Sequence, residues 1–189
     1  MQKIPNAIAI TTKKAPEKYD LGASKFFGIP TIPGEWVSDF DDDEIFFLQI
    51  KLSDIAELDT ENRLPHTGYL YLFLHTEDSK YHLRADLRYY DGEPDTALDG
   101  FNEAVDGYEQ YNSAWLMEFS KTDENEVCTR LFGFPSDWNY VDEPPKLLLQ
   151  YDPMDNKMDF LDSLDGFLYL FFGKNEKDLD KVTLWQEYS

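Results

Sequence analysis

The chain has 189 residues, of which 42% are hydrophobic and 16% aromatic, so it is long and apolar enough to bury a core of its own. Its 38 Asp and Glu against 17 Lys and Arg give a net charge of −21, which repels phosphate backbones and argues against binding nucleic acid. No apolar run reaches the roughly 18 residues of a membrane span and no signal-peptide pattern occurs, so we expect no membrane contact and a cytoplasmic location.

The first part of the chain predicts a turn followed by three strands. Residues 27–30, Phe-Gly-Ile-Pro, place a flexible residue two positions before one with a fixed φ, which favours a tight turn. The apolar run 46–50 is of strand length, and a short helix is expected at 53–58. The apolar run 68–74 predicts a strand covered on both faces, and the more nearly alternating run 81–90 predicts one with a face in water.

The second part of the chain repeats this order after a connecting segment, 91–126, that begins with a stretch rich in Asp, Gly and Pro. Residues 132–135, Phe-Gly-Phe-Pro, repeat the turn. The apolar runs 147–151 and 166–172 repeat the two covered strands, and residues 181–188 alternate again. Similar blocks in the same order argue for an internal duplication.

We therefore predict an α+β fold, predominantly β, made of two internally repeated β-rich halves. The halves extend over about 21–90 and 127–188, and the segment 91–126 connects them. Neither half is large enough to cover both faces of its apolar strands alone. We expect residues 1–189 to form a single domain with a pseudo-twofold axis between the halves.

The ordered motifs of the two halves also resemble those of a known protein family. The motifs that carry the resemblance lie at residues 24–30, 48–50, 64–71, 131–135, 147–152 and 165–172. In these motifs the chain resembles the YwqG-like family of bacterial proteins, whose common domain has no known function. The resemblance covers nearly the whole chain and implies a mostly β, internally duplicated cytoplasmic domain. It implies no catalytic residues.

Patterns typical of cofactor, metal and catalytic sites find little support. No glycine-rich phosphate loop and no glycine-flanked serine of a hydrolase occurs, and the acidic run 39–44 lacks the glycine and final glutamate of a calcium hand. Cys128, the only cysteine, permits no intramolecular disulfide and is interpreted as a small buried residue. A zinc site at His75 and His82 would need further ligands from Asp or Glu. We predict no cofactor and no metal.

Gln49 and Gln150 are the most informative polar residues, because each interrupts an apolar strand at the equivalent place in its half. A buried amide without partners costs about 1–3 kcal/mol, so we expect both to be hydrogen-bonded. The favoured interpretation is that they tie each strand to a neighbouring loop. The alternative is that they line a cleft shared by the halves, with Asp152 at its rim and Trp36 and Trp138 as its walls.

Two functions fit these observations. The favoured one is a non-enzymatic, acidic protein-binding module whose negative field attracts a basic partner, with neutralisation of a basic toxin as its sharpest form. The alternative is a small-ligand binder or enzyme that uses the cleft between the halves around Gln49, Gln150 and Asp152. The charge is also compatible with a role in solubility alone.

Overall fold

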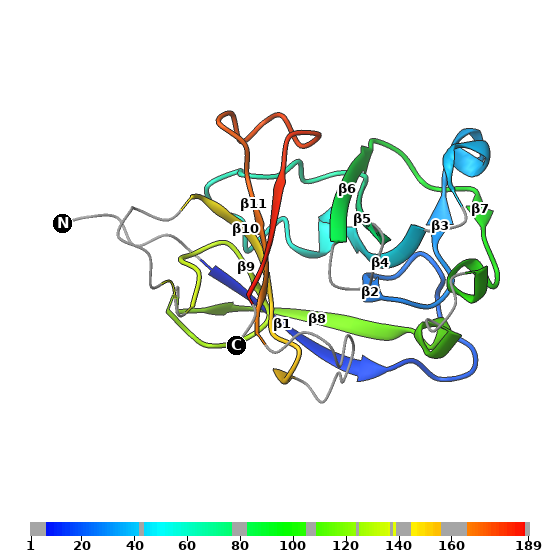
Figure 1. Ribbon diagram of the computed structural model, residues 1–189, viewed down its shortest axis with the longest axis horizontal. Coiled ribbons are helices and arrows are strands. Elements are labelled where there is room, and N and C mark those ends of the chain that lie inside the picture. Colours follow the sequence, from blue (N-terminus) through cyan, green and yellow to red (C-terminus); the bar gives the residue numbers. More distant parts are fainter. Residues whose placement is uncertain are drawn as a thin grey trace.

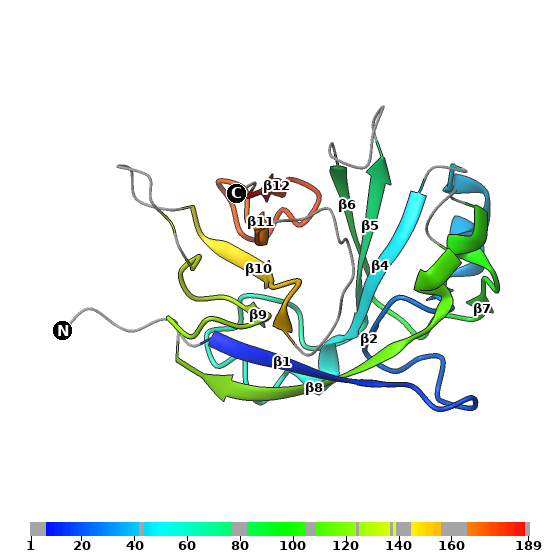
Figure 2. The ribbon, with the colours of Figure 1, turned by 60° about the horizontal axis from the view of Figure 1, so that its bottom comes forward.

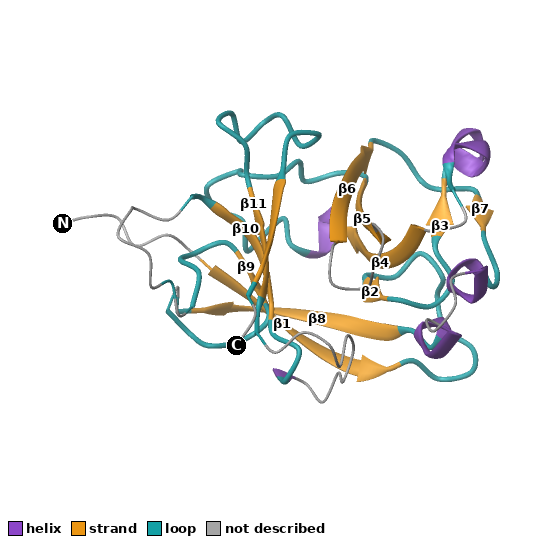
Figure 3. Ribbon diagram, in the orientation of Figure 1, coloured by secondary structure: helices purple, strands orange, loops and turns teal. Residues whose placement is uncertain are grey.

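The computed structural model describes residues 7–41, 44–76, 83–104, 109–123, 125–136, 138, 145–155 and 166–187. Strands dominate these residues and the helices are short 3-10 turns, which confirms a predominantly β fold (Figure 3). The large sheet has ten strands and nearly closes on itself (Figure 1). No helix in the described part of the chain combines the length and apolarity that crossing a membrane requires.

The strands range in length from two to eight residues. The strands of the large sheet are β1 (Ala7–Lys14), β2 (Lys25–Phe26), β4 (Glu44–Lys51), β5 (Tyr69–Thr76), β6 (Leu83–Tyr90), β8 (Trp115–Thr122), β9 (Arg130–Leu131), β10 (Leu147–Tyr151), β11 (Leu168–Phe171) and β12 (Thr183–Gln186). A small second sheet pairs β3 (Thr31–Ile32) with β7 (Thr96–Ala97). The 3-10 helices are η1 (Gly34–Asp39), η2 (Leu52–Asp54), η3 (Phe101–Ala104) and η4 (Glu109–Asn112).

The order across the large sheet is β12-β11-β10-β9-β1-β8-β2-β4-β5-β6, with antiparallel pairing throughout. The central pair β1–β8 is in register from Ala7–Thr122 to Lys14–Trp115. Figure 2 shows two arms rising from this pair, one made of β2, β4, β5 and β6, the other of β9, β10, β11 and β12. The edge strands β6 and β12 approach at one end, where the backbone N–H of Leu83 donates to Oε1 of Gln186 at 3.5 Å.

One large apolar core fills the space between the two arms. It takes residues from both, among them Phe26, Leu48, Leu72, Leu131, Leu149 and Leu170. The outer face of β5 carries a second cluster, in which Trp36, Phe40 and Phe101 cover Tyr71 and Phe73. Every residue of 69–74, of β10 and of β11 is buried, so these strands are covered on both faces as their apolar runs predict.

The strands predicted at 46–50, 68–74, 147–151 and 166–172 are confirmed as β4, β5, β10 and β11. The central strands β1 and β8 carry no comparable sequence signal, because polar residues occupy much of each strand. β8 lies inside the segment 91–126, so that connection also contributes a strand to the middle of the sheet.

The shared core and the central strand pair lead to a prediction about fragments. Residues 1–90 contain β1 without β8, and residues 111–189 contain β8 without β1. We expect neither fragment to fold alone, because each lacks half of the core and half of the central pair. Calorimetry should show a cooperative transition for the whole chain and none for either fragment. A fragment that unfolds cooperatively near the Tm of the whole chain would contradict the shared core.

Candidate functional site

Gln49 lies on β4 with no exposed surface, and its side-chain amide is fully engaged. Its Nε2 donates to the carbonyl oxygens of Leu21 and Ala23 at 3.0 and 3.1 Å. Its Oε1 accepts hydrogen bonds from the backbone N–H and the hydroxyl of Thr31 at 3.1 and 3.2 Å. The amide therefore holds the segments on both sides of β2 against the sheet, and the expected hydrogen bonding is confirmed.

Gln150 lies on β10, equally buried, and makes a similar set of contacts. Its Nε2 donates to the carbonyl oxygen of Cys128 at 2.9 Å and to the hydroxyl of Ser136 at 3.0 Å. Its Oε1 accepts from the backbone N–H of Ser136 at 2.7 Å and from Arg130 at 3.4 Å. The guanidinium of Arg130 is itself buried and also donates to the carbonyl oxygen of Phe132 at 2.7 Å. The second glutamine thus fastens the loop that follows β9.

Lys25 stands opposite Gln49 in the pairing of β2 with β4 and has no exposed surface. Its Nζ donates to the carbonyl oxygen of Leu21 and lies 5.9 Å from the ring centres of Tyr19 and Phe46. Burial lowers the pKa of this lysine to about 7, because the charged form loses its hydration. Folding therefore shifts Lys25 towards its neutral form, and keeping the amine charged inside the protein costs stability.

Asp152 directly follows β10 and shapes the turn there. Its carboxylate accepts from the backbone N–H of Met154 at 2.9 Å, and its own N–H donates to the hydroxyl of Thr129 at 3.0 Å. The N–H of Thr129 in turn donates to the carboxylate of Asp155 at 2.7 Å. Burial raises the pKa of Asp152. These contacts are those of a turn-forming residue.

The two tryptophans lie in separate aromatic clusters. Trp36 in η1 packs edge-on against Tyr71 of β5, with ring centres 5.6 Å apart. Trp138 packs edge-on against Phe171 of β11 at 5.5 Å, in a different cluster. The structure therefore does not bring them together as two walls of one cleft, because each covers the outer face of a different arm.

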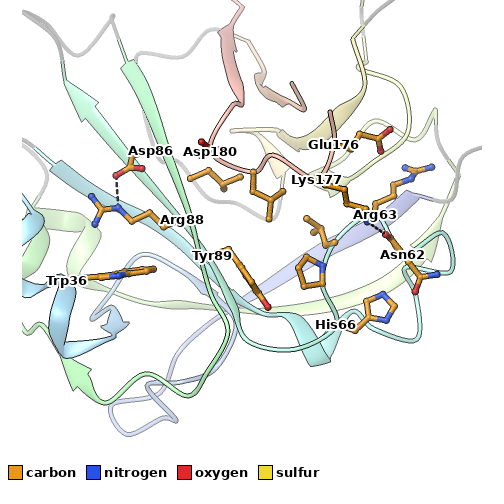
Figure 4. Close-up of a pocket in the computed structure, with 14 residues that line it drawn as sticks. Trp36, Asn62, Arg63, His66, Asp86, Arg88, Tyr89, Glu176, Lys177 and Asp180 are labelled. Carbon is orange, nitrogen blue, oxygen red and sulfur yellow. Dashed lines mark hydrogen bonds and ion pairs between the residues drawn. The ribbon is translucent and has the colours of Figure 1, made fainter. Parts of the chain in front are cut away.

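A groove of about 900 Å³ opens along the outer edge of β6 (Figure 4). Residues 62–66 and 176–180 form the side opposite β6. The Nζ of Lys177 donates to the carbonyl oxygen of Asn62 at 2.7 Å and so joins these two segments. Of the five predicted site residues, only Trp36 lines this groove. The groove lies between segments of the two predicted halves, but neither glutamine contributes to it.

The free edge of β6 faces this groove. In the described residues β6 pairs with β5 on one side only. The N–H of Leu83 points away from β5, towards Gln186. Because successive residues of a strand direct their backbone groups to alternate sides, the N–H and C=O groups of Ala85, Leu87 and Tyr89 also point outward. Leu87 and Tyr89 line the groove, so backbone groups that pair with no other strand among the described residues run along its wall.

The charged side chains of the groove largely balance each other, although the chain as a whole is strongly acidic. Arg88 donates from Nε to Asp86 at 2.7 Å, and its guanidinium lies 4.6 Å from the ring centre of Phe40. Arg63 pairs with Glu61 at 2.6 Å. The ionic side chains that line the groove are Arg63, Arg88 and Lys177 against Asp86, Glu176 and Asp180.

His66 lines the groove beside a buried carboxylate. Its Nε2 lies 3.4 Å from Oδ2 of Asp59. The same carboxylate accepts from the backbone N–H groups of Arg63 and Leu64 at 3.1 and 2.9 Å. Asp59 therefore shapes the loop that forms one side of the groove, and His66 rests against it.

A second polar cluster lies on the outer face of β4, β5 and β6. Glu44 stands opposite His75 in the register, with Oε1 3.8 Å from Nε2 of the imidazole. Asp86 of β6 completes a group whose ligand-type atoms lie within 4.8 Å of one another. The sequence singles out His75 together with His82, which lies outside the described residues. It does not show that Glu44 and Asp86 join His75, because that depends on the strand order.

Comparison with protein-family models found no match, and comparison with the curated proteins found none either. The resemblance to the YwqG-like family therefore stays a prediction from the motifs. The candidate site is defined by geometry alone: a groove beside an open strand edge, with a buried polar cluster nearby.

The glutamine contacts predict a matched loss of stability. Replacing Gln49 or Gln150 by Leu leaves the N–H of Thr31 or Ser136 without its acceptor inside the protein. We expect each variant to lose about 1–3 kcal/mol of unfolding free energy, and the two losses to be similar. Urea denaturation measures both. Unchanged stability in either variant would show that the amide does not hold its loop.

The buried lysine predicts a pH dependence. The pKa of Lys25 falls from 10.5 to about 7 on folding, so between these values the unfolded chain binds more protons. Stability should therefore rise with pH from about 7 towards 10, and Lys25→Met should lose this part of the rise. Urea unfolding at about pH 7 and 9 measures the difference, with the exposed Lys14→Met as control for the lost charge. Equal pH slopes in the wild type and Lys25→Met would contradict the shift.

Proposed function

We propose that this protein is a non-enzymatic binding module that takes an extended, basic segment of another protein along the free edge of β6. The proposal rests on the hydrogen bond from the N–H of Leu83 to Gln186, from which strand alternation directs the backbone groups of Leu87 and Tyr89 towards a groove of about 900 Å³. An exposed strand edge recruits an extended peptide through main-chain hydrogen bonds, and adjoining pockets select its side chains. No catalytic step is needed.

The charge of the chain supports a basic partner. The ionic groups of the groove balance, so attraction comes from the rest of the protein, whose net charge is −21. Such a field raises the association rate of a positively charged segment and weakens as salt screens it beyond about 8–10 Å. A basic toxin, neutralised by occupation of this edge, is the sharpest form of the proposal.

We also infer that the two arms are repeats of one unit, as the sequence motifs predict. Phe27 and Phe132 both have left-handed backbones, with φ of 54° and 64°. Their N–H groups donate to the carbonyl oxygens of Phe47 and Leu148, which lie at the bulges of β4 and β10. The matched contacts of Gln49 and Gln150 support the same inference. On this view β6 and β12 correspond, and the groove lies where the repeats meet.

A small-molecule ligand is the second candidate for the same groove. Its volume lies within the range of about 300–1,000 Å³ that is usual for ligand sites. Trp36 and Tyr89 supply aromatic surface, and residues of both predicted halves line it. This version keeps the predicted cleft between the halves but replaces the predicted glutamines and Asp152 by other residues.

Synthetic peptides test strand addition directly. A peptide of about ten residues with alternating Lys and Val, slightly longer than β6, should bind in fluorescence anisotropy, and its Glu–Val counterpart should not. Binding should weaken from about 0.1 to 1 M salt. Hydrogen exchange should show new protection of the amides of Leu87 and Tyr89.

N-methylation of alternate peptide amides provides the matched control. Methyl groups on one alternate set remove the donors that face β6 and should abolish binding, whereas methyl groups on the other set should spare it. Binding that survives both sets, or that leaves the amides of Leu87 and Tyr89 unprotected, would show attachment to the acidic surface alone. That result would overturn the proposal.

A further inference from the structure

Three polar side chains on rigid strands converge on the outer face of β4, β5 and β6. The register places Glu44 opposite His75, and places Asp86 opposite Phe73, two residues before His75 on the same face. One nitrogen or oxygen atom from each of the three polar residues lies within 4.8 Å of the other two. Because all three belong to strands, the backbone fixes their relative positions.

Glu44 lacks a partner that its burial demands. The residue is 2% exposed, and its Oε2 is buried with no hydrogen-bond partner among the described residues. Its Oε1 accepts from the backbone N–H of Asp41 at 3.2 Å, but the 3.8 Å to His75 is too long for a hydrogen bond. A buried carboxylate oxygen is costly unless a cation or a proton meets it. Burial accordingly raises the pKa of Glu44.

Arg88 supplies only part of the positive charge that the cluster needs. Its Nε donates to Oδ2 of Asp86, and its Nη1 lies 3.8 Å from a carboxylate oxygen of Asp39. Arg88 therefore engages one oxygen of Asp86 and shares its charge with a third carboxylate. The two carboxylates of the cluster keep oxygen atoms available beside the imidazole of His75, which is 8% exposed.

We infer that Glu44, His75 and Asp86 form a binding site for one divalent transition-metal ion, with Zn²⁺ as the representative. Zn²⁺ binds imidazole nitrogen and carboxylate oxygen at about 2.0–2.2 Å, which sets the ligand atoms about 3.4 Å apart in a tetrahedron. The ligand-type atoms of the three residues lie within 4.8 Å of one another, so binding the ion requires the side chains to move closer together. The imidazole favours a transition metal over Mg²⁺ and Ca²⁺, which take oxygen ligands.

The position of Asp86 gives the site an open side. Asp86 also lines the groove, and its side chain is 30% exposed, whereas Glu44 and His75 are buried behind it. Three protein ligands leave a fourth position for water or for a group that enters from the groove. The ion would therefore be reached from the side on which the edge of β6 is open.

Calorimetric titration of the full chain with ZnCl₂ tests the site. The protein is first stripped with EDTA, and MgCl₂ at about millimolar concentration is added to occupy weak sites on the acidic surface. We expect one equivalent of Zn²⁺ to bind and to raise the Tm. Affinity should fall by about tenfold or more in His75→Gln and in Asp86→Asn. Asp86→Asn changes a partly exposed residue and so tests the site even if His75→Gln folds poorly.

His66→Gln is the matched control, because it removes another histidine that rests against a carboxylate. It should bind Zn²⁺ as the wild type does. CoCl₂ gives a test without any variant: Co²⁺ with few ligands absorbs far more strongly in the visible range than hydrated Co²⁺. Zinc binding that His75→Gln and Asp86→Asn leave unchanged, or a cobalt spectrum equal to that of the hydrated ion, would overturn the inference.

Discussion

The antiparallel pairing of β1 with β8 is the interaction on which the rest of the structure depends. It joins two arms that are otherwise connected mainly through packing, and each arm adds its strands outward from this pair. Because sheets twist, the arms curve towards each other and enclose a common apolar core. The edges β6 and β12 then approach at Leu83 but do not pair along their length, so the groove is a consequence of incomplete closure.

Both arms contain a buried side-chain amide within an otherwise apolar strand segment. Each amide makes hydrogen bonds to a segment with little backbone pairing of its own, because β2 and β9 are only two residues long. The irregular backbone around these short strands needs donors and acceptors inside the protein, and Gln49 and Gln150 supply them. A cationic side chain accompanies each amide, Lys25 in one arm and Arg130 in the other, and both direct N–H groups at backbone carbonyl oxygens.

The sequence predicts the strands that are mostly apolar, because a long apolar run of strand length favours a strand covered on both faces. It does not predict β1 and β8, whose position in the sheet comes from backbone pairing and not from a distinctive side-chain pattern. The glutamines are found from sequence because a polar residue in an apolar run requires explanation. The groove and the cluster of Glu44, His75 and Asp86 are not found, because they unite residues that only the strand order brings together.

An edge that accepts a foreign strand also accepts the same edge of another copy, which is the usual route from open sheets to aggregation. The outward groups of β6 have no proline to block them, as its sequence is LRADLRYY. Each copy of this chain nevertheless carries a net charge of −21, so two copies repel each other and their β6 edges are kept apart. The same negative charge attracts a positively charged segment of another protein. Under the proposed function, the acidity of the chain disfavours self-association through this edge and leaves the edge available to a positively charged segment.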